Sequence, residues 1–254
     1  MKRIALTLIL FAYVRFGYAQ SPVSARIRSG YDVGMAYATG NYNPSLTYYQ
    51  LLTLGEHRLF SIGYTARLTP FYGDNLNFYT APARLTRGKT GFSALGAPLL
   101  KQNVDTVRFD YVTTTALNVG IRAQVNLGKV ELGASADLLG LTLGRWRDVR
   151  YISSTGRFRT GAGDSTIATF QGVNASQRAF PTRANVRLLG DNDRGTLATE
   201  VYARFRLNQR VGIKAGYQWL TTEVTVANRD IVANNDRFRH RVGMAYVAVT
   251  LPIF

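Results

Sequence analysis

The stretch that decides the fold is residues 107–143, which read VRFDYVTTTALNVGIRAQVNLGKVELGASADLLGLTL. Across 109–127 every second residue suits an apolar setting, and most residues between them are polar or small. Gly128-Lys129 then forms a tight turn, and the alternation resumes over 130–138. Period two indicates β-strands with two different faces. These strands are much longer than the usual length of about 5–6 residues, and each has one apolar and one polar face. This combination predicts a barrel wall with lipid outside and a polar lumen inside.

Composition agrees with an all-β membrane protein and excludes several other classes. A hydrophobic fraction of 46% and a mean hydropathy of −0.07 are too mild for a helical membrane protein, whereas alternating strands average out near zero. The absence of cysteine excludes disulfides, thiolate metal sites and a cysteine nucleophile. The formal net charge of +16 comes mostly from arginines spread through the expected loops, without a basic tail or helix. That distribution argues against nucleic acid as a partner.

Residues 1–19 have the organisation of a secretory signal peptide. Lys2 and Arg3 form a positive start, 4–14 is a short apolar segment, and small residues precede the expected cleavage site. The sequence therefore predicts one exported barrel domain over 20–254.

Turn-forming residues divide the rest of the chain into strands of an up-and-down antiparallel transmembrane barrel. Short turns at 55–57, 128–129 and 208–209 alternate with longer links at 39–45, 73–105, 144–195 and 223–237. Within the third link, 146–153 and 166–171 are expected to extend the barrel strands. Ten strands result if 76–85 and 92–100 pair as a hairpin. The favoured reading has eight strands, at 27–38, 46–54, 58–72, 107–127, 130–143, 196–207, 210–222 and 238–254.

The two faces of these strands differ in chemistry. The face expected to line the lumen holds charges of both signs, which is tolerable only where they pair. A soluble barrel would have the opposite arrangement. The expected lumen charge network is Asp32, Arg67, Asp110, Arg122, Glu131, Asp137, Glu200, Arg204, Arg206 and Lys214. The opposite face holds aromatics expected to form girdles at the membrane interfaces, namely Tyr31, Tyr37, Tyr64, Tyr72, Tyr111, Tyr217 and Trp219.

The last residues, 246–254, read YVAVTLPIF and resemble the C-terminal strand of bacterial outer-membrane β-barrel proteins. In that family an alternating strand ending in phenylalanine, here Phe254, is read by the barrel-assembly machinery. With the signal peptide and eight strands, the chain resembles the small outer-membrane barrels of the OmpA and OmpX type, from Bacteroidetes by the style of its loops. The resemblance implies a location in the bacterial outer membrane.

No catalytic, cofactor-binding or metal-binding residue is expected. His57 falls in a turn on the periplasmic side, and an Asp191-Asn192-Asp193 loop is followed at once by Arg194, which suits a solvated turn better than a calcium site. His240, with Asp230 and Asp236 upstream, keeps open the alternative of a rim enzyme that acts on lipid A.

The basic outer loops are the most suggestive functional feature. Guanidinium groups bind phosphate in bidentate fashion, and lipid A phosphates and acidic glycans lie just outside an outer membrane. The residues expected to contact lipopolysaccharide or anionic glycans are Arg145, Arg147, Arg150, Arg157, Arg159, Arg239 and Arg241. The favoured function is therefore a monomeric structural or surface-interaction barrel. A narrow passive pore is the alternative.

Overall fold

A computed structural model describes residues 26–55, 57–160 and 166–253. The signal peptide expected at 1–19 and the C-terminal Phe254 lie outside these described residues. The described chain is almost entirely antiparallel β-structure, with a few short helical turns. None of its helices is long and apolar enough to cross a membrane.

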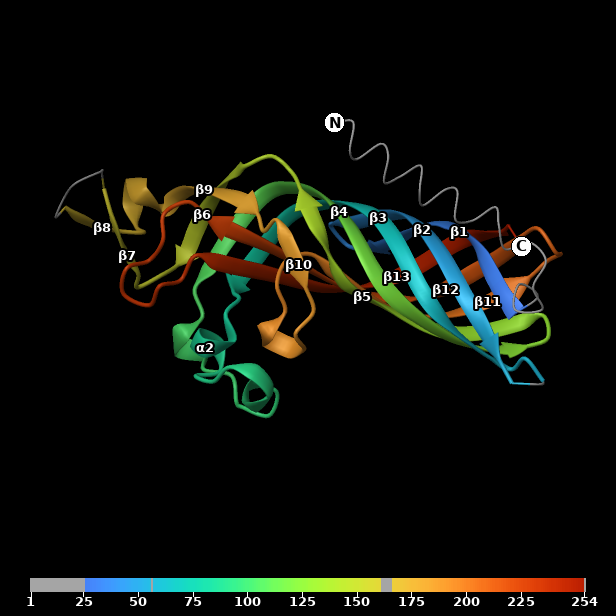
Figure 1. The fold of residues 1–254 in the computed structure, drawn as a ribbon. Helices are drawn as coiled ribbons and strands as arrows, with labels where there is room; N and C mark the ends of the chain where they lie inside the picture. Colours follow the sequence, from blue (N-terminus) through green and yellow to red (C-terminus); the bar gives the residue numbers. More distant parts are fainter. Residues whose placement is uncertain (1–25, 56, 161–165, 254) are drawn as a thin grey trace, which may run out of the picture.

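Eight strands close into a barrel-like ring (Figure 1). Each strand pairs with its neighbours in the chain, except that β5 pairs with β11, and β13 returns to pair with β1. The ring strands are β1 (Ile27–Ala38), β2 (Asn41–Leu54), β3 (Phe60–Thr80), β4 (Thr106–Leu127), β5 (Val130–Leu143), β11 (Leu197–Arg206), β12 (Gly212–Val226) and β13 (Arg237–Pro252). We call the end that carries the turns after β2, β4 and β11 the turn end, and the opposite end the loop end. The described chain begins and finishes at the turn end.

The first loop-end connection is shorter than the sequence predicted. Residues 41–45 belong to β2, although Asn, Pro and Ser favour turns, so the predicted 39–45 link was wrong. Only Thr39 and Gly40 separate β1 from β2, and Gly40 adopts the positive φ of 71° that such a two-residue hairpin turn requires. Ring closure overrides local turn preference here, because Asn41 and Asn43 point into the ring and are buried.

At the loop end the ring narrows from eight strands to six. The β1–β2 hairpin stops at Gly40, so β13 pairs directly with β3 farther toward the loop end. On the other side, β6 (Arg147–Ser153) pairs with β4, and β9 (Ser176–Pro181) joins β6 to β12. We call this second closed ring of β3, β4, β6, β9, β12 and β13 the six-strand extension. The expectation that 146–153 extends the barrel strands is thus met by β6.

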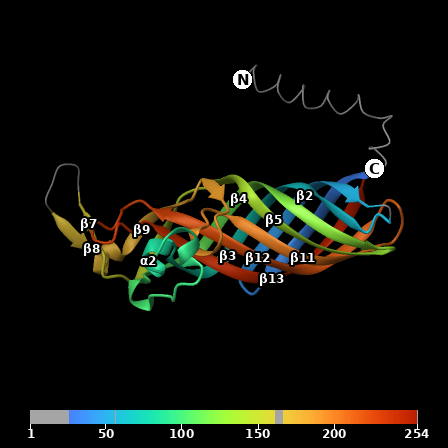
Figure 2. The same ribbon diagram turned by 60° about the horizontal axis from the view of Figure 1, so that its bottom comes forward.

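The remaining loop-end segments are short. A two-stranded hairpin of β7 (Arg157–Arg159) and β8 (Ile167–Thr169) projects from the tip without joining the ring (Figure 2). The short strand β10 (Ala184–Val186) pairs with β5. The β3–β4 connection contains α2 (Ala83–Thr86) and the 3-10 turns η2 (Gly91–Ala94) and η3 (Lys101–Asn103). Two further 3-10 turns are η4 (Gly172–Ala175) and η5 (Gly190–Asn192). The hairpin of the ten-strand alternative is therefore not formed.

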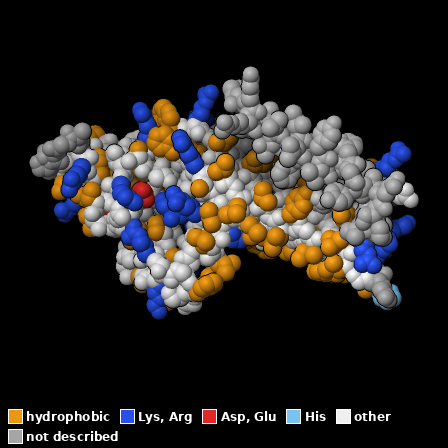
Figure 3. All heavy atoms as spheres, in the orientation of Figure 1, with side chains coloured by type: hydrophobic (Ala, Val, Ile, Leu, Met, Phe, Trp, Pro, Cys, Tyr) orange, Lys and Arg blue, Asp and Glu red, His pale blue; other side chains and the backbone are white. Residues whose placement is uncertain are grey.

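The two faces of the ring have the polarity expected from the sequence. Outward side chains are mostly apolar and about half exposed, as at Val33 (50%), Val119 (54%) and Val249 (46%), while most positions between them are buried, and these inward positions include all the buried charges of the ring interior. All seven predicted girdle aromatics point outward, between 40% and 49% exposed. Figure 3 shows apolar side chains along the ring and basic ones gathered toward both ends.

The phase of β3 and β4 slips by one residue where the ring meets the extension. Asp74 and Asn75 are both exposed, as are Asp110 and Tyr111 on the neighbouring strand, and Asn75 has a φ of 57°. Above the slip the inward residues are apolar. Phe109, predicted to face outward, is instead 1% exposed and packs on Phe78, with 4.9 Å between ring centroids.

A continuous aromatic core fills the six-strand extension. Tyr151 stacks on Phe170 at 4.3 Å and meets Phe238 edge-on at 5.6 Å, and Phe158 stacks on Phe170 at 4.7 Å. With Phe78, Phe109 and aliphatic residues such as Val149 and Val224, these rings are buried. Each buried aromatic or aliphatic side chain stabilises the fold by about 1.5–3 kcal/mol. The loop end of the ring is therefore closed by packed side chains.

Candidate functional site

The interior of the eight-stranded ring is a network of buried ion pairs centred on Asp32. Its carboxylate lies 2.7 Å from the Arg122 guanidinium and 3.0 Å from Lys214 Nζ, and it accepts a hydrogen bond of 2.7 Å from Thr250. Asp32, Arg122 and Lys214 are all 0% exposed. Buried charges of this kind are tolerated because each faces an opposite charge at contact distance.

Two further groups extend the network along the ring. On the loop-end side, Glu200 pairs with Lys214 and with Arg67 (3.3 Å), and Arg67 also lies 3.6 Å from Asp137. On the turn-end side, Glu131 accepts a hydrogen bond of 2.7 Å from Arg204 and another from Arg206. The structure thus brings together nine of the ten charges expected in the lumen.

Asp110 is the exception. Its carboxylate is exposed and makes no ion pair with any described residue, because the phase slip of β4 turns it away from the interior. The period-two pattern gave no sign of this slip.

Sequence reasoning missed the tyrosines that complete the network. The Arg122 guanidinium lies over the rings of Tyr49 (4.7 Å) and Tyr202 (5.3 Å), and Lys214 Nζ lies 4.1 Å from the Tyr202 ring centre. Such cation–π contacts accommodate guanidinium faces that no carboxylate covers. The sequence indicated the inward phase of Tyr202 on β11 but left the phase of β2, and so of Tyr49, open, and nothing marked either tyrosine as a partner of arginine.

A second feature is a group of arginines on the outer surface, just above the apolar face of the ring. Arg145 and Arg150 are exposed, and no described carboxylate lies within ion-pair distance of either. Arg147 lies over the Tyr111 ring at 5.0 Å, and Arg178 lies over Trp146 at 4.4 Å. We call Arg145, Arg147, Arg150 and Arg178 the outer arginine group.

The other predicted anion contacts lie elsewhere. Arg157 and Arg159 are exposed on β7, at the distal hairpin. Arg239 is only 5% exposed and donates to Glu223 at 2.9 Å, so a protein carboxylate already occupies it. Arg241 binds Asp191 at 2.7 Å. The expected single anion surface is therefore divided among three places.

Asp191 ties two loop-end connections to the ring. It accepts from Arg87 at 2.5 Å and pairs with Arg241, and its neighbour Asn192 exchanges hydrogen bonds with the backbone of Gly91. These contacts join segments about a hundred residues apart, which the sequence could not reveal. Arg87 and Arg241 already bind the Asp191 carboxylate, which a calcium ion would need as a ligand. The loop therefore serves as a clasp between the two connections and the ring.

The Asp191 clasp is expected to open in acid. Burial raises the pKa of Asp191, but hydrogen bonds and charges from Arg87 and Arg241 outweigh it, and the pKa lies below its ordinary value. A lowered pKa means that the stabilisation is present above about pH 4 and is lost as pH falls through the folded-state value. Hydrogen exchange of the backbone amides of 83–94 and 187–195, corrected for intrinsic rates, should therefore become faster as the pH falls below about 4. At pH 7, Asp191→Asn should reproduce the effect and Asp148→Asn, an exposed control, should not; unchanged protection in Asp191→Asn would contradict the clasp.

His240 does not form the His–Asp pair considered from the sequence. Its Nδ1 lies 3.0 Å from the Asn77 carbonyl oxygen, and its ring packs against Phe78. Asp230 instead accepts from the backbone of Arg157, and Asp236 pairs with Arg229. Among the described residues, no group of three potential metal ligands occurs.

No known protein family and no curated protein matches this sequence. Among solved structures, the crystal structure of Neisserial surface protein A (NspA) matches over 89% of this chain and 94% of that chain, with 7% identity and a TM-score of 0.31. At that level of likeness, the fold assignment rests on the strand pairings of this chain itself.

Proposed function

We propose that the chain is an outer-membrane barrel protein with a structural or surface-interaction role, whose ring is surrounded by lipid. The observation that carries the proposal is the inverted polarity of the ring. Four carboxylates and four cations are buried inside, while the outward positions hold no charged side chain over these described stretches of the ring strands: 31–37, 42–54, 60–72, 111–127, 130–143, 197–205, 213–221 and 243–251. Soluble monomers rarely expose an apolar surface that encircles the molecule.

The shape of the chain supports the same reading. In outer-membrane barrels the short turns face the periplasm and the long connections face outward. Here β4 spans 22 residues, about twice the length that crosses a bilayer, so its loop-end part extends beyond the membrane. One chain closes its own ring, which favours a monomer. Recognition of Phe254 by the assembly machinery remains part of the proposal.

The outer arginine group is the proposed contact for lipopolysaccharide or anionic glycans. It lies above the apolar face, where phosphates of the outer leaflet would be, and it combines exposed guanidinium groups with Trp146 and Tyr111 at interface depth. Asp110 and Asp148 lie among these arginines and lower their net charge without cancelling it.

Replacing Arg145, Arg147 and Arg150 with glutamine should lower the lipopolysaccharide that copurifies with the folded barrel by about tenfold, because each loses a charge-assisted hydrogen bond to phosphate. Lipid A should be quantified by mass spectrometry per mole of protein. The matched control replaces Arg26, Arg58 and Arg210, three exposed arginines at the turn end. Unchanged lipid content in the first variant, or an equal fall in both, would contradict the contact.

The two alternative functions gain no support from the geometry. A passive pore would need a path through the aromatic core of the six-strand extension, where Phe78, Phe109 and Phe238 are at most 1% exposed. A rim enzyme based on His240 would need an acid partner, and no described carboxylate contacts its ring.

A further inference from the structure

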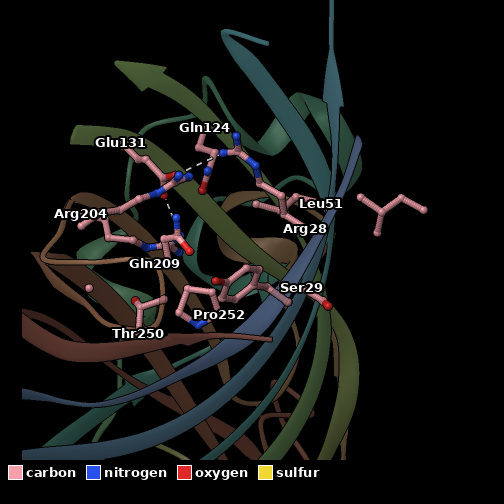
Figure 4. Close-up of a pocket in the computed structure, with 13 residues that line it drawn as sticks. Arg28, Ser29, Leu51, Gln124, Glu131, Arg204, Gln209, Thr250 and Pro252 are labelled. Atoms are coloured by element: carbon pink, nitrogen blue, oxygen red, sulfur yellow. Dashed lines mark hydrogen bonds and ion pairs between the residues drawn. The ribbon is translucent and has the colours of Figure 1, made fainter. Parts of the chain in front are cut away.

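A hollow of about 350 Å³ opens at the turn end of the ring, at the opposite end from the outer arginine group (Figure 4). Its wall combines apolar side chains, Ile27 and Leu51, with hydrogen-bonding ones, Ser29, Gln124 and Thr250. Its volume falls within the range of about 300–1,000 Å³ that small-molecule sites occupy.

Three arginines converge on one carboxylate in this hollow. Glu131 is 0% exposed and pairs with Arg204 at 2.7 Å, with Arg206, and with Arg28 at 3.5 Å. Figure 4 shows Arg28 and Arg204 approaching Glu131 from different strands. The four buried carboxylates of the ring are balanced by its four buried cations. The partly exposed Arg28 and Arg206 therefore add two positive charges that no further carboxylate of the described interior neutralises.

The arginines have more hydrogen-bonding capacity than Glu131 can use. Three guanidinium groups carry about fifteen N–H donors, whereas a carboxylate offers about four acceptor sites. Among the described residues, Nε of Arg204 is buried without a hydrogen-bond or ion-pair partner, whereas Nη2 of Arg204 and Nη1 of Arg28 face carboxylates at 3.7 Å and 3.5 Å without forming a hydrogen bond. Arg204 is itself only 4% exposed, and it lines the hollow. A buried cation with unused donors favours an anionic ligand.

The surroundings of the hollow add attraction for anions. Arg26, Arg58, Lys129 and Arg210 are exposed around it, and Glu131 is the one carboxylate in the described parts of 26–30, 50–64, 122–133, 203–214 and 248–253. A concave site lined by charge of one sign concentrates ligands of the other sign.

We propose that this hollow binds a small organic anion that carries a phosphate or carboxylate group. Arg28 and Arg206 hold the anionic group at the mouth, with Arg204 behind them. Gln124 and Gln209 supply hydrogen bonds to polar atoms of the ligand, and Tyr49 and Leu51 cover its carbon atoms. The site does not depend on lipopolysaccharide or on any partner of the loop end.

The test is isothermal titration of the folded chain, in a non-ionic detergent at low ionic strength, with glycerol 3-phosphate. Saturable one-to-one binding is expected, and glycerol should not bind. The variant Arg28→Gln/Arg206→Gln should weaken binding by at least about tenfold, because it removes charged donors to the anion. The variant Arg183→Gln/Arg194→Gln removes the same charge from exposed positions at the loop end, far from the hollow, and should leave the affinity within about twofold of the unmodified chain.

Two sources of the phosphate are distinguished by a second titration with a short-chain phosphatidic acid. Equal affinity for both compounds identifies a soluble anion, and tighter binding of the phosphatidic acid identifies a lipid headgroup. Both variants are checked for folding by the heat-dependent shift of the barrel on a gel, and the single variants Arg28→Gln and Arg206→Gln replace the double one if it does not fold. Absence of saturable binding by the unmodified chain, or equal weakening in both double variants, would overturn the proposal.

Discussion

Replacing Val119 with arginine is expected to destabilise the folded ring by about 2–4 kcal/mol when the ring is embedded in a bilayer. Val119 lies near the middle of the part of β4 that belongs to the ring, points outward and is 54% exposed. A guanidinium there would lie in hydrocarbon, away from both interfaces. On the surface of a soluble protein, the same substitution at a half-exposed site would change stability by only about ±0.5 kcal/mol.

The measurement is the free energy of unfolding by urea in lipid vesicles. Ile152→Arg is the matched control: Ile152 is 56% exposed, but it lies on β6 in the six-strand extension, above the proposed membrane. Its substitution should cost less than about 1 kcal/mol, because the penalty falls off toward the interface. Equal effects at the two positions would show that lipid does not surround the ring.

The alternation of outward apolar and inward side chains, which makes Val119 a suitable test position, also made the ring predictable from the sequence. A wall between two unlike media imposes period two over its whole length, and a one-residue error in phase would place every charge in the apolar medium. The phase assigned from sequence therefore holds along β1, β12 and β13, where Tyr31, Trp219 and Val249 face outward as expected.

The same rule explains why the six-strand extension was hidden. Above the slip at 110–111 the interior is apolar, so polarity inverts just where the phase shifts by one residue. The two changes cancel in the sequence: Phe109 and Tyr111 both fit one alternating series, although the first faces inward and the second outward. A pattern of hydrophobicity therefore cannot distinguish a regular strand from one in which the inward phase and the polarity of the interior change at the same residue.

Pairing partners were less predictable than faces. The sequence indicated which charges face inward, but Arg67 lies against Ser135, Asp137 and Glu200 on two other strands, and only the closed register determines those distances. The Asp191 clasp and the three arginines on Glu131 likewise join segments with no periodic relation. The turn-end hollow therefore had no signal in the sequence beyond the inward phase of its arginines.

Neutralising Asp32 is expected to cost about 3–5 kcal/mol of unfolding free energy, because it leaves buried cations without their counter-charge. Asp32→Asn keeps the shape of the side chain and removes only its charge. Arg122, Lys214 and, at 3.7 Å, Arg204 then face a neutral amide in a fully buried position. Urea unfolding in lipid vesicles measures the loss, and Asp110→Asn, at an exposed position of β4, should change stability by no more than about 0.5 kcal/mol.

A second substitution separates charge balance from simple damage to packing. If the cost arises from unpaired cations, replacing Lys214 with methionine in the Asp32→Asn background should recover part of it, because one excess charge leaves the interior together with the lost carboxylate. The coupling between the two positions should reach about 0.5–3 kcal/mol, as expected for groups in direct contact, here 3.0 Å apart. Strictly additive losses would mean that the two groups act independently, and the interior would then be held together by packing rather than by mutual neutralisation.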